Sequence, residues 1–136
     1  MEQDRNAGKP AQTMESSERI FDRKALLIRT LNSMELATEL VQMCLHELTQ
    51  DMSAIRDEID RGDGPGLSKS AHTLKGVLGN LSAEAACEAA LALEIIGRQG
   101  ALDKAAAAYS SLEYEINRLQ PMLTAFLGAD CSDLPV

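Results

Sequence analysis

One histidine, His72, lies in a run from Ser68 to Asn80 whose residue types suggest chemistry on a helix surface. In a helix each residue advances by about 100°, which places a defined set of side chains beside the histidine. Those within about 60° of it are Ser68, Lys75, Gly76 and Gly79. The opposite side carries the residues that a helix would bury, which are Leu67, Ser70, Ala71, Leu74, Val77, Leu78 and Leu81. We therefore expect His72 to face solvent.

The two glycines beside His72 need a physical reason. Glycine inside a helix costs about 1 kcal/mol relative to alanine, and close approach of another molecule would offset that cost. Gly76 and Gly79 would leave the imidazole accessible, and Lys75 offers an ammonium group to an anion held there. Because histidine keeps a free ring nitrogen near neutral pH, the combination of nucleophile, cation and clearance favours phosphoryl transfer.

The hexapeptide from Ala71 to Gly76 reads Ala-His-Thr-Leu-Lys-Gly. It resembles the phosphorylation motif of histidine-containing phosphotransfer (HPt) domains, the relay modules of bacterial two-component phosphorelays. The resemblance extends from about Phe21 to Leu127, and its further matches are Phe21-Asp22, Leu26-Leu27, Gly62-Asp63, Leu93-Glu94 and the segment from Leu119 to Leu123. Ser82 departs from the pattern, since the family usually has glycine after the motif helix; we expect this serine to cap the next helix.

The resemblance implies a role for each residue of the motif. His72 would be the phosphoacceptor, Lys75 would stabilise the phosphate, and Gly76 would provide clearance. The donor would be the phosphoaspartate of a response-regulator receiver domain, and a hybrid sensor histidine kinase would start the relay. His72 would attack through Nε2, and the phosphate would later pass to the aspartate of another receiver.

The chain itself shows no apparatus for using ATP. We find no Gly-rich phosphate loop and no pair of carboxylates placed to hold magnesium, and we expect no general base beside His72. The protein is therefore predicted to be a phosphocarrier without kinase activity of its own. No cofactor or metal is expected on this chain, and Mg²⁺ is expected only in the partner receiver.

Residues that flank His72 on its exposed side are candidates for binding the receiver. These are Ser68, Lys69, Gly79 and Asn80. The alternative interpretation of Lys69 and Asn80 is an ordinary solvated helix face.

Composition excludes several other classes of protein. The chain has 136 residues, which suits one domain, and a net charge of −8, which disfavours binding to nucleic acid. Its three cysteines are far apart, as is typical of a reducing compartment. There is neither a membrane-length apolar run nor the apolar core of a signal peptide. We expect a cytoplasmic protein, and Met1 with the short tails favours a free-standing one.

The first half of the chain predicts two helices after a tail. Residues 1–19 are polar and are expected to be disordered. Asp22 can cap a short helix that ends near Leu31, and Asn32, with Glu35 three residues later, matches a capping box for a long helix up to Gly62. The stripe predicted for burial on that helix is Leu36, Leu40, Cys44, Leu48, Met52, Ile55 and Ile59.

The second half predicts three further helices. Pro65 suits the first turn of the motif helix, which should end near Leu81. An alanine-rich helix follows from Ser82 to Gly100. The last helix is expected to be kinked or broken near 117–120 by Pro121, and residues 128–136 are expected to form a polar tail. Its predicted stripe is Leu102, Ala105, Tyr109, Leu112, Ile116, Leu119, Leu123 and Phe126.

These elements predict an all-α fold. Four long helices with short connections and no strand pattern favour an antiparallel up-and-down four-helix bundle over residues 20–127, with the short N-terminal helix against one end. Four stripes in one chain can close a core without a partner, so we expect a monomer.

His46 supports a second hypothesis. The segment from His46 to Thr49 resembles the box of sensor-kinase dimerisation helices, which also carry a phosphorylated histidine, but it lacks the proline that usually follows. Its position between Cys44 and Leu48 predicts an outward orientation. A third hypothesis is a helical interaction module in which His72 is never phosphorylated; the glycine pair argues against it.

Overall fold

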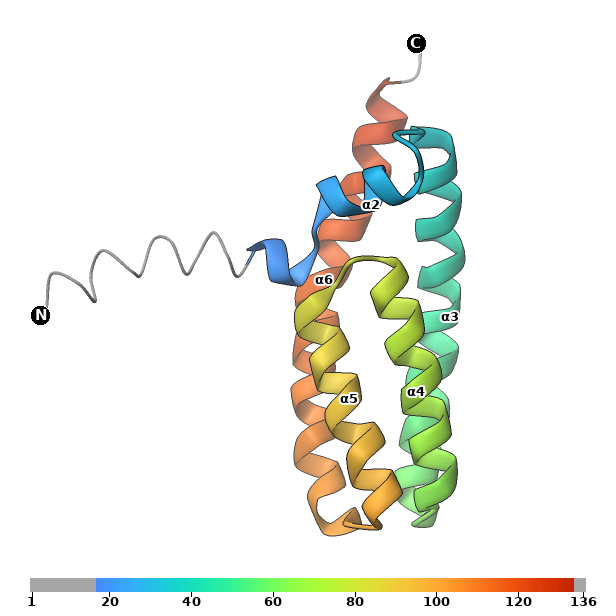
Figure 1. The fold of residues 1–136 in the computed structure, drawn as a ribbon, viewed down its shortest axis with the longest axis vertical. Coiled ribbons are helices and arrows are strands. Elements are labelled where there is room, and N and C mark those ends of the chain that lie inside the picture. Colours follow the sequence, from blue (N-terminus) through green and yellow to red (C-terminus); the bar gives the residue numbers. More distant parts are fainter. Residues whose placement is uncertain (1–16, 134–136) are drawn as a thin grey trace, which may run out of the picture.

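The computed structural model describes the backbone of residues 17–133 and the side chains of residues 17–128. Four long helices lie side by side along one axis, and a short helix crosses one end (Figure 1). Successive long helices run in opposite directions, as in the predicted up-and-down bundle. Their bounds are Met34–Arg61 for α3, Gly64–Asn80 for α4, Glu84–Gln99 for α5 and Ala105–Asp133 for α6; α2 is Arg23–Arg29 and a 3₁₀ turn, η1, is Leu102–Lys104.

Local sequence explains most of the helix ends. Asp22 caps α2 by accepting a hydrogen bond from the backbone N–H of Ala25 at 3.0 Å, and Asp63 caps α4 by accepting from Gly66. Pro65 lies in the first turn of α4, as predicted, where no intrahelical partner is lost. Helices α3 and α5 end at Gly62 and Gly100, both left-handed with φ of 69° and 72°.

Two details of the helix starts differ from the predictions. The cap of α3 is Ser33, whose side chain accepts from Leu36 N at 3.1 Å, whereas Asn32 takes a left-handed conformation with φ of 60°. Ser82 does not cap α5: it too is left-handed, with φ of 59°, and the cap position is Ala83. This conformation explains why glycine would suit position 82.

The core follows the predicted stripes with one shift. On α3 the buried residues begin with Ala37 and Val41 and continue through Cys44, Leu48 and Ile55, whereas Leu36 is 47% exposed. The stripe prediction was wrong at Leu36 because the 3.6-residue period places position 37, rather than 36, in line with 41 and 44. The predicted positions of the last helix, of which Leu102 lies in η1 and the others in α6, are all buried or packed against the core.

The last helix continues through Pro121 to Asp133. The predicted break near 117–120 is therefore wrong, although the proline still removes one N–H donor from the helix. The helix also extends past residue 127, where the polar tail was expected to start. Residues 134–136 lie outside the described part of the chain.

The N-terminal segment is folded from Ser17 onwards, earlier than the expected start at residue 20. Residues 17–20 form a helical turn, and Arg19 pairs with Glu84 and Glu88 on α5. Phe21 packs edge-on against Phe126 of α6, with ring centroids 5.9 Å apart. The predicted tail residues 1–16 lie outside the described residues.

None of the helices described over residues 17–133 combines the length and apolar composition that crossing a membrane requires.

Candidate functional site

Helix α4 presents His72 to solvent because its opposite face is buried. Ala71, Leu74 and Leu78 are fully buried in the core, and the predicted buried face is confirmed except at Ser70, which is half-buried. Ser70 donates a hydrogen bond to Glu58 Oε2 on α3 at 2.9 Å. The His72 side chain is 67% exposed, so the outward orientation is confirmed.

A buried glutamate on the neighbouring helix holds the imidazole. Glu94 of α5 is 6% exposed, and its Oε2 lies 3.1 Å from His72 Nδ1. Two cations share the same carboxylate: Lys75 Nζ lies 2.8 Å from Oε1, and Arg98 donates to Oε2 at 2.9 Å. One carboxylate from α5 thus joins the histidine and the lysine of α4.

The charge state of Glu94 determines which nitrogen of His72 is free. Its pKa is lowered, first by Lys75 and then by His72, while burial acts in the opposite direction. An ionised carboxylate only accepts hydrogen bonds, so the Nδ1 of His72 must carry the proton that it donates. In the neutral imidazole this leaves the lone pair on Nε2, at the side of the ring away from Glu94.

Neither Glu94 nor Arg98 was predicted from the sequence to belong to the site. The expectation that no general base lies beside His72 was wrong, because the carboxylate of Glu94 is there. Lys75 was expected to offer its ammonium group to an anion, but it is already paired with Glu94 and only 29% exposed. A signal existed: Glu94 lies on the buried stripe of α5 with Ala90, Leu93 and Gly97, where a glutamate requires a partner.

The glycines of α4 leave open space beside His72. A Cβ atom placed on Gly76 or on Gly79 would have no atom within 4 Å beyond its own local helix backbone. Neither glycine is therefore required by packing within the protein. Their cost in helix stability is explained by clearance on the His72 face.

Two other glycines bring α4 and α5 together. A Cβ on Gly97 would lie 2.6 Å from Ser68 N and 2.7 Å from Gly64 O, which is closer than real Cβ contacts. A Cβ on Gly64 would in turn lie 2.9 Å from Gly97 O. Backbones can approach this closely only without side chains between them. Glu94, one turn before Gly97, is thereby held close to His72.

The remaining predicted residues occupy different parts of this surface. Lys69 and Asn80 are exposed, Gly79 is partly exposed, and Ser68 lies at the contact with Gly97. The structure contains no partner, so a binding role for these four residues stays a prediction. His46 is exposed on α3, as predicted, and its Nε2 lies 3.3 Å from Gln50 Nε2.

Two solved structures share this fold. The crystal structure of histidine-containing phosphotransfer protein B (HptB) from Pseudomonas aeruginosa PAO1 matches with a TM-score of 0.75 and 19% identity, over 80% of this chain and 95% of that one. The HPT domain of a sensor hybrid histidine kinase from Shewanella matches with a TM-score of 0.72 and 14% identity, over 82% and 97%. No curated protein sequence matched the chain.

A family model decides the assignment. The model described as "Hpt domain" matches residues 39–125, which is more than half of the chain and includes both His72 and Glu94. The chain therefore belongs to the Hpt domain family and has the family's role, histidine phosphotransfer in two-component relays.

Proposed function

We propose that His72 is the residue that carries the phosphoryl group. The observation that supports this most directly is the arrangement around the ring: Glu94 accepts a hydrogen bond from Nδ1, and the side chain is 67% exposed. Nε2 is thereby available to a phosphodonor, and Gly76 leaves space for that donor to approach.

In the proposed reaction, the Nε2 lone pair attacks the phosphorus of a receiver's phosphoaspartate. The N–P bond forms as the P–O bond to the aspartate breaks, and the aspartate leaves as a carboxylate. The imidazole becomes cationic in this step, and Glu94 stabilises it through the Nδ1 proton. The reverse reaction delivers the phosphate to a second receiver aspartate.

Lys75 has a second role in this proposal. Its ammonium pairs with Glu94 and its side chain is 29% exposed, and a phosphate on His72, one turn away on the same helix, would add negative charge nearby. Lys75 then partly neutralises phosphohistidine. The exposed Arg98, paired with the same carboxylate, adds a second cation to the site.

The receiver supplies the rest of the chemistry in this proposal, including Mg²⁺ and the groups that activate the phosphoaspartate. The chain acts as a monomeric phosphocarrier between receivers, fed by a hybrid sensor histidine kinase. Much of the rate then comes from alignment of His72 with the phosphoaspartate on docking. The cytoplasmic location expected from the sequence stays a prediction.

The test uses purified receiver domains charged with acetyl phosphate and Mg²⁺. Wild type is expected to gain acid-labile, base-stable phosphate from at least one receiver, and His72→Gln is expected to gain none. His46→Gln is the matched control, since it removes the chain's other histidine. Label that survives His72→Gln, or is lost in His46→Gln, would contradict the assignment.

A further inference from the structure

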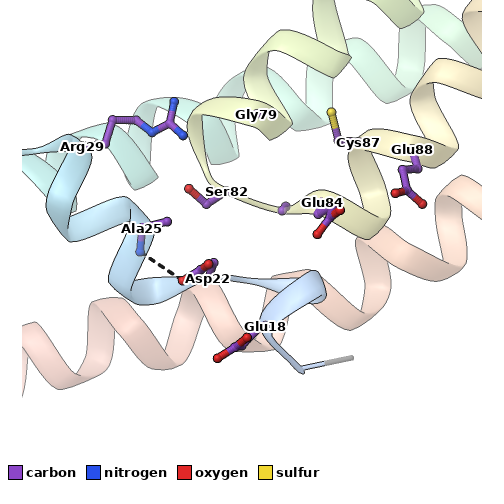
Figure 2. A pocket seen from close by; sticks show the side chains of 10 residues that line it. Glu18, Asp22, Ala25, Arg29, Gly79, Ser82, Glu84, Cys87 and Glu88 are labelled. Atoms are coloured by element: carbon purple, nitrogen blue, oxygen red, sulfur yellow. Dashed lines mark hydrogen bonds between the residues drawn. The ribbon is translucent and has the colours of Figure 1, made fainter. Parts of the chain in front are cut away.

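An open depression of about 330 Å³ lies beside the end of the motif helix (Figure 2). Three parts of the chain line it: the N-terminal segment with α2, the last turn of α4, and the loop with the first turns of α5. The residues that line it include Glu18, Asp22, Arg29, Gly79, Ser82 and Cys87. Of these residues, only Gly79 was predicted from the sequence to bind a partner.

The depression is continuous with the His72 face. Gly79 lines it and lies two helical turns beyond His72 on the same side of α4, about 10 Å along the axis. Cys87 also lines it, and its Sγ lies 3.5 Å from the carbonyl oxygen of Lys75. The depression therefore begins next to the residues that surround the phosphoacceptor.

The size of a protein interface places this depression under a docked receiver. A standard interface buries about 800 Å² on each partner, which corresponds to a disc with a radius of about 16 Å. A receiver that centres its aspartate on His72 would extend beyond Gly79, about 10 Å away. The docked surface would cover the depression.

The residues that line the depression indicate which kind of partner side chain would fill it. Ala25, Ala83 and Cys87 provide apolar wall, while four carboxylates lie at the lining against one guanidinium, that of Arg29. Arg19 adds a second cation by pairing with Glu84 and Glu88, which still leaves an excess of negative charge.

We propose that this depression is a docking socket for a lysine or arginine side chain of the receiver domain that exchanges phosphate with His72. The proposal rests on the function proposed above. The aliphatic stem would pack on the apolar wall, and the cationic head would lie among the carboxylates. The socket contributes to affinity and partner choice, and takes no part in the chemical step.

The first test fills the socket. The rate of phosphate transfer from a charged receiver is measured against receiver concentration for wild type and Cys87→Leu. We expect the half-saturating concentration to rise about tenfold, because an occupied socket excludes the receiver's side chain, with the maximal rate unchanged. Ser110→Leu is the matched control, since Ser110 lines a depression of about 320 Å³ formed by α3 and α6. It is expected to leave both constants unchanged.

The second test changes charge at an exposed position. Glu18→Lys should raise the half-saturating concentration about threefold at low salt, and high salt should reduce the difference, because the interaction is between exposed charges. This variant replaces an exposed side chain and leaves the core intact.

A footprint on the wild-type protein does not depend on any variant folding. The protein is treated with iodoacetamide with and without the receiver, and alkylation of Cys87 is measured by mass spectrometry of the peptides. The docked receiver should slow this alkylation. Cys44, which is 2% exposed, is the internal control and should stay unmodified in both samples.

The outcomes separate the two proposals. Suppose that His72 is phosphorylated, that Cys87→Leu and Glu18→Lys leave the half-saturating receiver concentration unchanged, and that the receiver does not protect Cys87 from alkylation. The socket is then refuted and the phosphocarrier function stands. If no receiver phosphorylates His72 in wild type, the proposed function fails, and the socket fails with it.

Discussion

Glu94 on α5 accepts a hydrogen bond from the Nδ1 of His72 on α4, at 3.1 Å, while its other oxygen pairs with Lys75 at 2.8 Å. A nucleophile on one helix is thus oriented by a buried carboxylate on the next. The carboxylate in turn is kept ionised by the lysine that lies one turn from the nucleophile, as its lowered pKa indicates.

Glu94→Gln should change the tautomer of His72. The amide can donate as well as accept, so it no longer requires the proton to reside on Nδ1. At a pH at which the imidazole is neutral, we expect ¹⁵N NMR of wild type to show mainly the tautomer with the proton on Nδ1. The spectrum of Glu94→Gln should show a mixture of the Nδ1–H and Nε2–H tautomers. Transfer should slow about tenfold, because part of the population lacks the Nε2 lone pair and because the neutral amide no longer stabilises the imidazolium formed in the step. An unchanged tautomer ratio would refute the orienting role.

Lys75→Ala should leave His72 able to accept phosphate but should shorten the lifetime of phosphohistidine. The ammonium offsets the charge of the phosphate, and the exposed setting limits the effect to about threefold at low salt. Lys69→Ala removes a neighbouring exposed lysine of the same helix and serves as the control. Equal lifetimes in the two variants would show that Lys75 has no specific role.

Gly76→Ala should stabilise the protein and slow its reaction. No atom beyond the local helix backbone lies within 4 Å of the added Cβ, so the gain in helix propensity, about 1 kcal/mol, should appear in urea unfolding. Gly76→Leu should likewise fold, but it should reduce transfer from a receiver further because its side chain obstructs the approach to His72. Transfer at the wild-type rate in the leucine variant would contradict the clearance argument.

Gly97→Ala should have the opposite effect on stability. Its Cβ would lie 2.6 Å from Ser68 N, so α5 must move away from α4 at a cost of about 2 kcal/mol. The shift would also separate Glu94 from His72. We expect a lower urea midpoint together with a mixed His72 tautomer in ¹⁵N NMR; Gly79→Ala, an alanine in open space, should show neither change.

Ser82→Gly should stabilise the loop between α4 and α5. Ser82 has φ of 59°, a conformation that costs non-glycine residues about 1 kcal/mol, and its buried Oγ lacks a partner among the described residues. Ser82→Ala removes the hydroxyl but keeps the left-handed strain, so the difference between the two variants in urea unfolding reports the strain alone. If the glycine variant is no more stable than the alanine variant, backbone strain at Ser82 is excluded.

Local sequence was sufficient for the helices and for the direction of His72. The period of Leu67, Ala71, Leu74 and Leu78 identifies the buried face of α4, and the histidine lies opposite, whatever packs on that face. The cap at Asp22 and the ends at Gly62 and Gly100 were equally local, because capping depends on neighbouring residues only. The helix does not break at Pro121, because a long helix packed along the bundle tolerates the loss of one hydrogen bond.

The sequence by itself therefore determined the family resemblance, the bundle and an exposed His72 with open space beside it. Only the tertiary structure decided that Glu94 and Arg98 complete the site, that Lys75 is held rather than free, and that the N-terminal segment forms a depression with α5. The physical reason is that these contacts depend on the axial register of α4 against α5, set where Gly64 and Gly97 meet. Helical periodicity gives the rotation of each helix about its own axis but carries no information on that register.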